Sequence, residues 1–238
     1  MSQNLPVPGD ALLENAVQVS LLALSEDGKY PASARLAAYY RPDGNYAGAS
    51  FAEMDRGDAD DIGTSDLHAL TMLNVRVGPR ATRRLLPGGE HLGPYRDDVK
   101  TCLSRVAMTD RLEDAGPDLL ARMSELFLAV LGALKDPTRS RSVPWVTASK
   151  LCSRKRPGTF PVRDRVVCQQ LGLLGSGLPR GDHRLDYRVF QYLLRNSEVI
   201  RAVDDLGDRV RASGQRPDQH RLKVLDAALW THATWGTG

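Results

Sequence analysis

Hydrophobic residues recur every three or four positions through most of the chain, and the strict alternation typical of β-strands is almost absent. This pattern predicts an all-α fold of about ten helices. The most regular repeat is residues 117–134, where eight large apolar side chains fall on one helical face. Further repeats predict helices at residues 11–24, 30–40, 65–75, 80–86, 95–106, 187–195, 197–212 and 218–234.

Turn and capping residues set the expected ends of these helices. Asp10 is a suitable N-cap for the first helix, and Arg41-Pro-Asp-Gly44 is a turn signal after the second. We expect residues 46–51 to form a loop. The acidic segment Glu53–Asp61 does not have the ligand spacing of an EF-hand, so we expect a solvated loop there as well.

The bulk composition is that of a soluble globular protein. The chain has 238 residues, of which 42% are hydrophobic and 26% charged. No apolar run approaches the roughly 20 residues that a bilayer-spanning helix needs, and the first residues lack the features of a secretory signal. We therefore expect a cytoplasmic protein with no membrane partner. No internal segment is a clear linker, so we expect one domain, 1–238, with two lobes (roughly 1–110 and 111–238) and a cleft near 143–164.

The cysteines, histidines and glycines carry no signature of a metal or a cofactor. Cys102, Cys152 and Cys168 fit neither a disulfide framework nor a CxxC metal site, so we expect reduced and mostly buried thiols. The five histidines are isolated from one another, which argues against a metal site. The sequence has no Walker loop, GxGxxG or GxSxG motif. We expect neither a metal nor another cofactor.

Positive charge is concentrated in one segment, residues 139–165. This segment holds eight Lys or Arg residues and one carboxylate, a local charge of +7 (8 − 1), whereas the whole chain has a net charge of only +3. Such a concentration suggests a polyanionic partner. The alternative for the run Arg154-Lys155-Arg156 is a solvated helix end, where cations complement the helix dipole. Lys150 shares a helix face with Arg154 and points either into a cleft or into solvent.

The single carboxylate of this segment, Asp164, follows Pro161-Val162 and opens a second apolar helix at residues 166–171. At such a position an aspartate is an N-cap, an ion-pair partner for Arg163 or Lys150, or a catalytic base. The sequence leaves these alternatives open.

The segment from Thr147 to Asp164 resembles the helix-hairpin-helix DNA glycosylase superfamily, of which endonuclease III is a member. In that superfamily a hairpin of the form Leu-Pro-Gly-Val-Gly-x-Lys-Thr-Ala precedes a catalytic aspartate by sixteen residues, and here Ala148 lies sixteen residues before Asp164. Pro157 also falls where those proteins often have a proline. The match covers about 25 residues and implies that Asp164 stabilises a developing sugar cation and orients the attacking water.

Three positions depart from the glycosylase pattern. Ser142 and Pro144 replace the two hairpin glycines that let backbone amides approach a phosphate. Val146 occupies the position of the Schiff-base lysine, which excludes a lyase reaction through that position. Lys150 would have to move to replace that lysine. No cysteine cluster of the kind that holds an iron–sulfur cluster follows.

More of the chain resembles an uncharacterised family common in actinomycete genomes. The motif that carries this resemblance is Trp-Val-Thr-Ala-x-Lys followed by Arg-Lys-Arg-Pro, found here between Trp145 and Pro157, together with Leu225-Asp-Ala-Ala-Leu-Trp230. No activity is known for that family.

Three functional hypotheses follow. The first is a nucleic-acid-directed protein of the glycosylase type, with Asp164 and Lys150 as catalytic residues and with a set of ligand- or phosphate-binding residues: Arg154, Lys155, Arg156, Arg163, Arg165, Trp145 and Tyr46. Trp145 either stacks on a base or anchors its helix in the core. The second is an enzyme or binding protein for a small phosphorylated or nucleoside-like molecule of actinomycete specialised metabolism, held in a compact pocket. The third is a structural or regulatory protein without chemistry.

Overall fold

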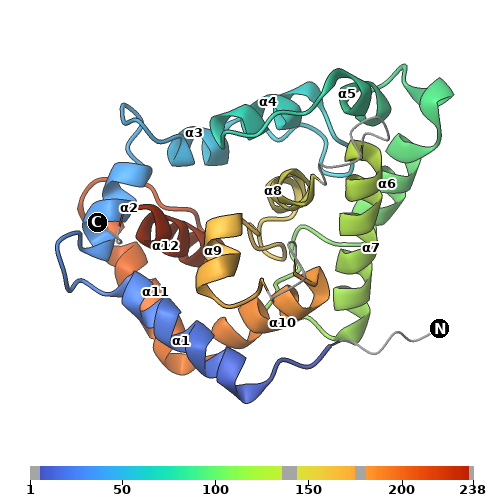
Figure 1. The fold of residues 1–238 in the computed structure, drawn as a ribbon. Coiled ribbons are helices and arrows are strands. Elements are labelled where there is room, and N and C mark those ends of the chain that lie inside the picture. Colours follow the sequence, from blue (N-terminus) through green and yellow to red (C-terminus); the bar gives the residue numbers. More distant parts are fainter. Residues whose placement is uncertain (1–5, 136–143, 175–180, 236–238) are drawn as a thin grey trace.

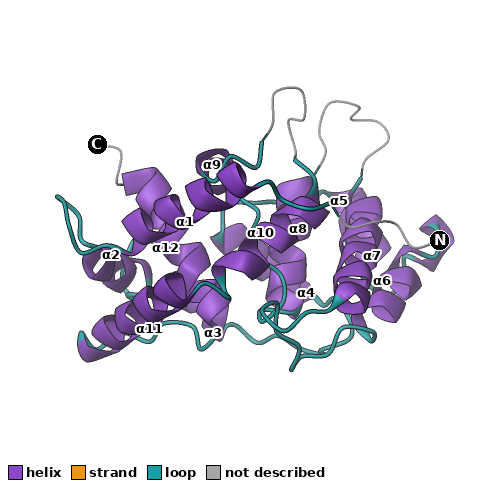
Figure 2. Cartoon of the chain, turned by 90° about the horizontal axis from the view of Figure 1, so that it is seen from below, coloured by secondary structure: helices purple, strands orange, loops and turns teal. Residues whose placement is uncertain are grey.

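The computed structural model describes residues 6–135, 144–174 and 181–235. These residues form twelve α-helices and one short 3₁₀ helix and contain no strand, which confirms the all-α prediction (Figure 2). The α-helices in chain order are α1 (Asp10–Leu24), α2 (Ala32–Tyr39), α3 (Gly48–Glu53), α4 (Thr64–Met72), α5 (Pro79–Leu85), α6 (Tyr95–Leu103), α7 (Pro117–Leu134), α8 (Trp145–Lys155), α9 (Arg165–Gln170), α10 (His183–Leu193), α11 (Ser197–Ala212) and α12 (Arg221–Trp235). The 3₁₀ helix is η1 (Glu90–Leu92).

Two predicted helices, α7 and α11, have the observed ends, whereas two features near the N-terminus were predicted wrongly. Asp10 is the first residue of α1 and Gly9 is its N-cap, so Asp10 contributes its charge to the first turn instead of capping it. Residues 46–51, expected as a loop, include most of α3. This helix of six residues has no side-chain cap and begins with Gly48, so the local sequence carries no helix signal.

The helices form one core that joins the two ends of the chain. Helices α1 and α2 pack against α11 and α12, while α4, α5 and α6 lie on the side of α7 and α8 (Figure 1). A single cluster of buried hydrophobic side chains extends from Ala16 to Leu229. These contacts do not follow a boundary near residue 110, because helices from the first hundred residues belong to both groups.

Helix α7 supplies a central part of this core. Its buried face includes Met123, Leu126, Phe127 and Val130, as its apolar period predicts. Helix α8 lies near the middle of the view in Figure 1 and contacts both α4 and α7. Nine of its eleven residues are buried, so its polar side chains must find partners inside the protein.

The cysteines are free thiols, as predicted. Cys152 and Cys168 are buried and Cys102 is half-buried, and burial raises the pKa of all three thiols. In the described parts of the chain, no helix combines the length and the apolar character needed to cross a bilayer.

Candidate functional site

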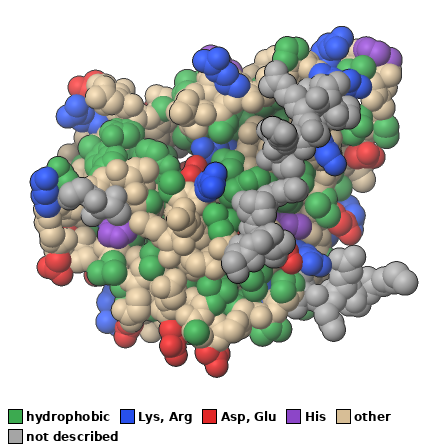
Figure 3. Space-filling view, in the orientation of Figure 1, with side chains coloured by type: hydrophobic (Ala, Val, Ile, Leu, Met, Phe, Trp, Pro, Cys, Tyr) green, Lys and Arg blue, Asp and Glu red, His purple; other side chains and the backbone are tan. Residues whose placement is uncertain are grey.

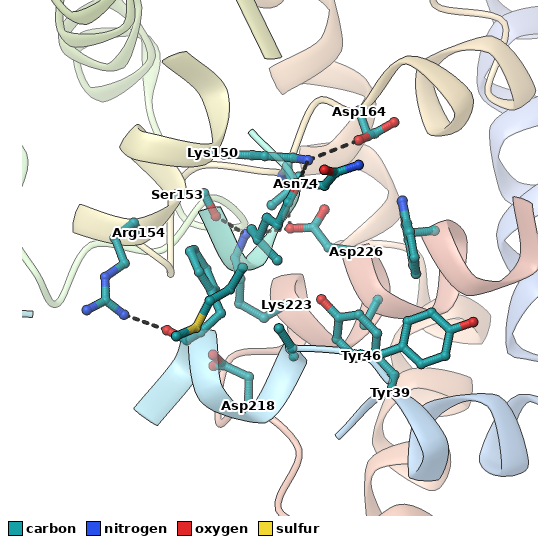
Figure 4. A pocket seen from close by; sticks show the side chains of 18 of the residues that line it. Tyr39, Tyr46, Asn74, Lys150, Ser153, Arg154, Asp164, Asp218, Lys223 and Asp226 are labelled. Carbon is teal, nitrogen blue, oxygen red and sulfur yellow. Dashed lines mark hydrogen bonds and ion pairs between the residues drawn. The ribbon is translucent and has the colours of Figure 1, made fainter. Parts of the chain in front are cut away.

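A cavity of about 570 Å³ lies between α2, α3 and the end of α4 on one side and α8, α9 and α12 on the other. Its lining combines charged side chains, among them Lys150, Asp164 and Asp226, with the aromatic rings of Tyr46 and Trp230. Figure 4 shows the charged groups on α8 and α12 facing the tyrosines across the cavity. The segment 143–164, where we expected a cleft, supplies part of this wall.

The first charged pair in the cavity joins Lys150 of α8 to Asp164. Lys150 Nζ lies 3.3 Å from Asp164 Oδ2 and also donates a hydrogen bond of 3.0 Å to the carbonyl oxygen of Leu73. Asp164 Oδ1 accepts the backbone N–H of Val166 at 3.2 Å, so Asp164 is the N-cap of α9. Asp164 is therefore both an N-cap and an ion-pair partner of Lys150, and its side chain still lines the cavity.

The turn after α4 gives Lys150 its carbonyl partner. Asn74 follows Leu73 with φ of +56°, in the left-handed region, and it is the one non-glycine residue of the described chain with a positive φ. Asparagine tolerates this conformation better than most residues. The turn brings Leu73, Asn74 and Val75 to the wall of the cavity beside Lys150 (Figure 4).

A second charged pair, which we did not predict, lies deeper in the same cavity. Lys223 Nζ donates to Asp226 Oδ2 at 2.5 Å, to Ser153 Oγ at 2.7 Å and to the carbonyl oxygen of Phe160 at 2.7 Å. Three acceptors occupy the three N–H groups of the ammonium. Lys223 thus ties α12 to α8 and to the segment that precedes Asp164, and it has no N–H group left for a ligand.

Within this second pair, one carboxylate oxygen of Asp226 lacks a hydrogen-bond donor. Its Oδ2 accepts both Lys223 Nζ and the backbone N–H of Val162, the latter at 3.0 Å, whereas its Oδ1 has no hydrogen-bond partner among the described residues. Burial raises the pKa of Asp226, and the neighbouring ammonium of Lys223 opposes that rise. A lone aspartate in the apolar run Leu225–Trp230 was the sequence signal that could have identified it.

Aromatic rings form another part of the wall. The ring of Trp230 lies 5.9 Å from that of Tyr39 and 6.0 Å from that of Tyr46, and Tyr46 also contacts Trp235 at 4.6 Å. Tyr46 is therefore placed in the cavity. Trp145 is not: it is buried in the core, with the guanidinium of Arg163 over its ring. Its alternative role as a core anchor is the one observed.

The run Arg154-Lys155-Arg156 does not form the phosphate-binding surface that we expected. All three side chains are at most 2% exposed. Arg154 and Lys155 both bind Asp66 of α4, at 3.3 and 2.9 Å, and Asp66 is itself fully buried. Arg156 binds Asp60 at 2.5 Å. A buried cation needs an internal acceptor, and these residues have found theirs inside the protein.

The acidic segment Glu53–Asp61 supplies most of the remaining acceptors, through its backbone. Arg154 donates to the carbonyl oxygens of Met54 and Asp55, both at 2.6 Å, and Lys155 donates to those of Arg56 and Asp58. The carboxylates of Asp55 and Asp58 stay exposed, as expected, while their carbonyls point inward. The segment is thus a solvated loop on one face and a cation-binding scaffold on the other.

Of the other two arginines predicted to bind a ligand, one is buried and one is exposed. Arg163 is buried and pairs with Asp186 of α10 at 2.5 Å. Arg165 is exposed and lies at the edge of the cavity. Arg139, Arg141 and Ser142 lie outside the described residues. On the described part of the face drawn in Figure 3, Lys and Arg side chains are scattered, and they form no continuous basic patch.

Within the described residues, no three His, Cys, Asp or Glu side chains come together as a metal site.

Comparison with known proteins adds the family to this description. Neither a curated protein nor a solved structure matches the chain. A family model described as a family of unknown function, DUF6308, matches residues 32–233, which include both charged pairs and the aromatic wall of the cavity. The chain therefore belongs to the DUF6308 family of unknown function.

Proposed function

We propose that the protein binds one small, anionic, nucleoside-like molecule in this cavity. The observation that carries the proposal is the placement of Lys150 and Asp164, 3.3 Å apart, in one cavity with the rings of Tyr39, Tyr46 and Trp230. A volume of about 570 Å³ falls within the range of small-molecule sites. Aromatic rings favour a planar ring system, and the charged groups favour a polar substituent at its other end.

Three cations supply the preference for an anion. Lys150 Nζ has two protein acceptors, Leu73 O and Asp164 Oδ2, which leaves one N–H group for a ligand. Arg56 and Arg165 also line the cavity, and their guanidinium groups make no hydrogen bond or ion pair with other described residues. A phosphate or carboxylate at this end of the ligand would gain charge-assisted hydrogen bonds.

A monomeric ligand is favoured over a nucleic acid because the basic residues are used internally. Binding a nucleic acid requires several cations arranged along a surface, and each phosphate contact adds to the salt dependence of binding. Arg154, Lys155 and Arg156 were the candidates for that surface, and they are at most 2% exposed. Nucleic-acid binding is therefore an outcome of the test below and not our proposal.

The chemistry that this site would support is hydrolysis of an N-glycosidic bond in the bound molecule, in which water adds to the anomeric carbon of the sugar and the base leaves with a proton. Asp164 Oδ2 faces the cavity, and its partner among the described residues is Lys150. A carboxylate in that position stabilises positive charge that develops on a sugar ring as the base departs. Lys150, which contacts the same oxygen, would position the carboxylate and hold the anionic end of the ligand.

The test compares monomers with polymers. Thermal unfolding is measured with nucleosides, nucleoside 5′-monophosphates and short single-stranded and duplex oligonucleotides, at low and at physiological salt. We expect a monophosphate to raise the unfolding temperature of the native protein and of Lys29→Met, an exposed control, but not that of Lys150→Met. Stabilisation by oligonucleotides alone, lost at physiological salt, would overturn the proposal in favour of a nucleic-acid-binding protein.

A further inference from the structure

The carboxylate of Asp226 has one satisfied and one unsatisfied oxygen. Oδ2 accepts Lys223 Nζ and the backbone N–H of Val162, whereas Oδ1 has no partner among the described residues. The side chain is 7% exposed and lines the cavity. A buried carboxylate oxygen without a donor costs free energy, and a ligand that brings a donor recovers part of it.

From this arrangement we infer that Asp226 Oδ1 is the acceptor for an N–H donor on the ring of the ligand, so that the site selects heterocycles bearing an amino group. This inference rests on the proposed function, since it names the substrate class of the same cavity. Asp226 then accepts a hydrogen bond from the ring of the ligand, while Lys150 binds its anionic end.

The surroundings of Asp226 support a ring over a sugar hydroxyl or an alkyl amine. Trp230 follows Asp226 by one helical turn on α12, so both side chains lie on the same face of that helix. The rings of Tyr39 and Tyr46 contact Trp230, which places the aromatic wall next to the carboxylate. A planar ring that stacks on this wall brings its edge towards Asp226.

The bonding of Oδ2 makes the substitution Asp226→Asn informative. Lys223 Nζ and the N–H of Val162 are both donors, so the amide oxygen of the asparagine must face them. The amide nitrogen then occupies the position of Oδ1. The substitution therefore keeps the two hydrogen bonds that this oxygen accepts, removes the counter-charge of Lys223, and changes the group that faces the ligand from an acceptor to a donor.

The experiment measures dissociation constants for two pairs of probes that differ by a single amino group. The pairs are guanosine and inosine 5′-monophosphate, and adenosine and purine riboside 5′-monophosphate. We expect the native protein to bind the amino-bearing member about tenfold or more tightly in at least one pair, the effect of one hydrogen bond to a charged group. Asp226→Asn should abolish or reverse that preference and leave the affinity for the other member within about twofold.

The control is Asp204→Asn, which makes the same change at an exposed carboxylate outside the cavity, one that pairs with Arg221 at 2.7 Å. It should keep the preference of the native protein. Should Asp226→Asn fail to fold, the comparison of the probe pairs on the native protein still decides.

Equal affinities within both pairs would overturn the inference about Asp226 and leave the proposed function standing. A preference that persists in folded Asp226→Asn would also overturn it. If none of the four nucleotides binds, the proposed function fails, and the inference fails with it.

Discussion

Lys155 Nζ lies 2.9 Å from Asp66 Oδ2, although 89 residues separate them and neither side chain is more than 2% exposed. The pair joins the C-terminal end of α8 to α4. Arg154 contacts the second oxygen of the same carboxylate. A run of cations that looks in the sequence like a binding surface is in fact part of the interior, where it fixes the wall of the cavity.

Loss of the Asp66 carboxylate should therefore destabilise the protein strongly. In Asp66→Asn, the two buried cations lose their shared counter-charge, which costs about 3–5 kcal/mol in comparable buried pairs. The free energy of unfolding in urea is the measurement. The matched control is Asp208→Asn, which breaks an exposed pair with Arg211 and should cost under about 1 kcal/mol. If both variants cost the same small amount, the pairing of Asp66 inside the protein is wrong.

The aromatic wall depends on the absence of a side chain at Gly48. A Cβ atom there would clash with the ring of Tyr39, so Gly48→Ala should displace that ring and weaken ligand binding by about tenfold or more. Gly132→Ala is the control, because a Cβ at this position in the last turn of α7 meets nothing within 4 Å and should stabilise the helix by up to about 1 kcal/mol. Unchanged ligand affinity in Gly48→Ala would show that Tyr39 takes no part in the site.

A pH dependence of stability follows from His183 of α10. Its Nε2 lies 2.7 Å from Ser124 Oγ and its ring stacks on Phe127. Burial, together with the charge of Arg163, lowers the pKa of His183 from 6.5 to about 4. Between these values the unfolded chain binds a proton that the folded protein does not, so the free energy of unfolding falls as the pH falls from 6.5 to about 4.

The comparison of native protein with His183→Gln isolates this effect, which amounts to about 3 kcal/mol over the whole window. Burial raises the pKa of Asp186 to about 6, and its contribution has the opposite sign in the same range, but it is present in both proteins and cancels in the difference. We expect the stability advantage of the native protein to shrink as the pH is lowered. Parallel stability curves for the two proteins would contradict the assignment.

The proposed catalytic role of Asp164 can be separated from its role as an N-cap. Asp164→Asn keeps an oxygen for the N–H of Val166, so the free energy of unfolding should change by less than about 1 kcal/mol. It removes the charge that would balance a developing cation, so release of free base from a bound nucleotide should fall about 100-fold or more. Chromatography of the released base is the measurement. Base release at the native rate would assign Asp164 to capping alone.

Helices with a long apolar period were predictable, and the partners of buried polar groups were not. The repeat in residues 117–134 specifies α7 because each apolar position contributes independently to one face. The N-cap role of Asp164 was one of the alternatives that its place before an apolar segment left open, and the structure shows it. The ion-pair partner of Lys155, by contrast, is Asp66, and a sequence does not reveal which distant carboxylate pairs with which cation. For the same reason Lys223 and Asp226, both inside an apolar helix, were missed as part of the site.

The central claim, that Lys150 binds the anionic end of a small ligand in this cavity, is tested most directly by calorimetric titration of native protein and Lys150→Met with a nucleoside and its 5′-monophosphate. The account predicts that the native protein binds the monophosphate about tenfold or more tightly than the nucleoside and that Lys150→Met binds the two equally, because the charge-assisted contact is lost. If Lys150→Met keeps the full preference for the monophosphate, Lys150 does not bind the anion and the account is wrong.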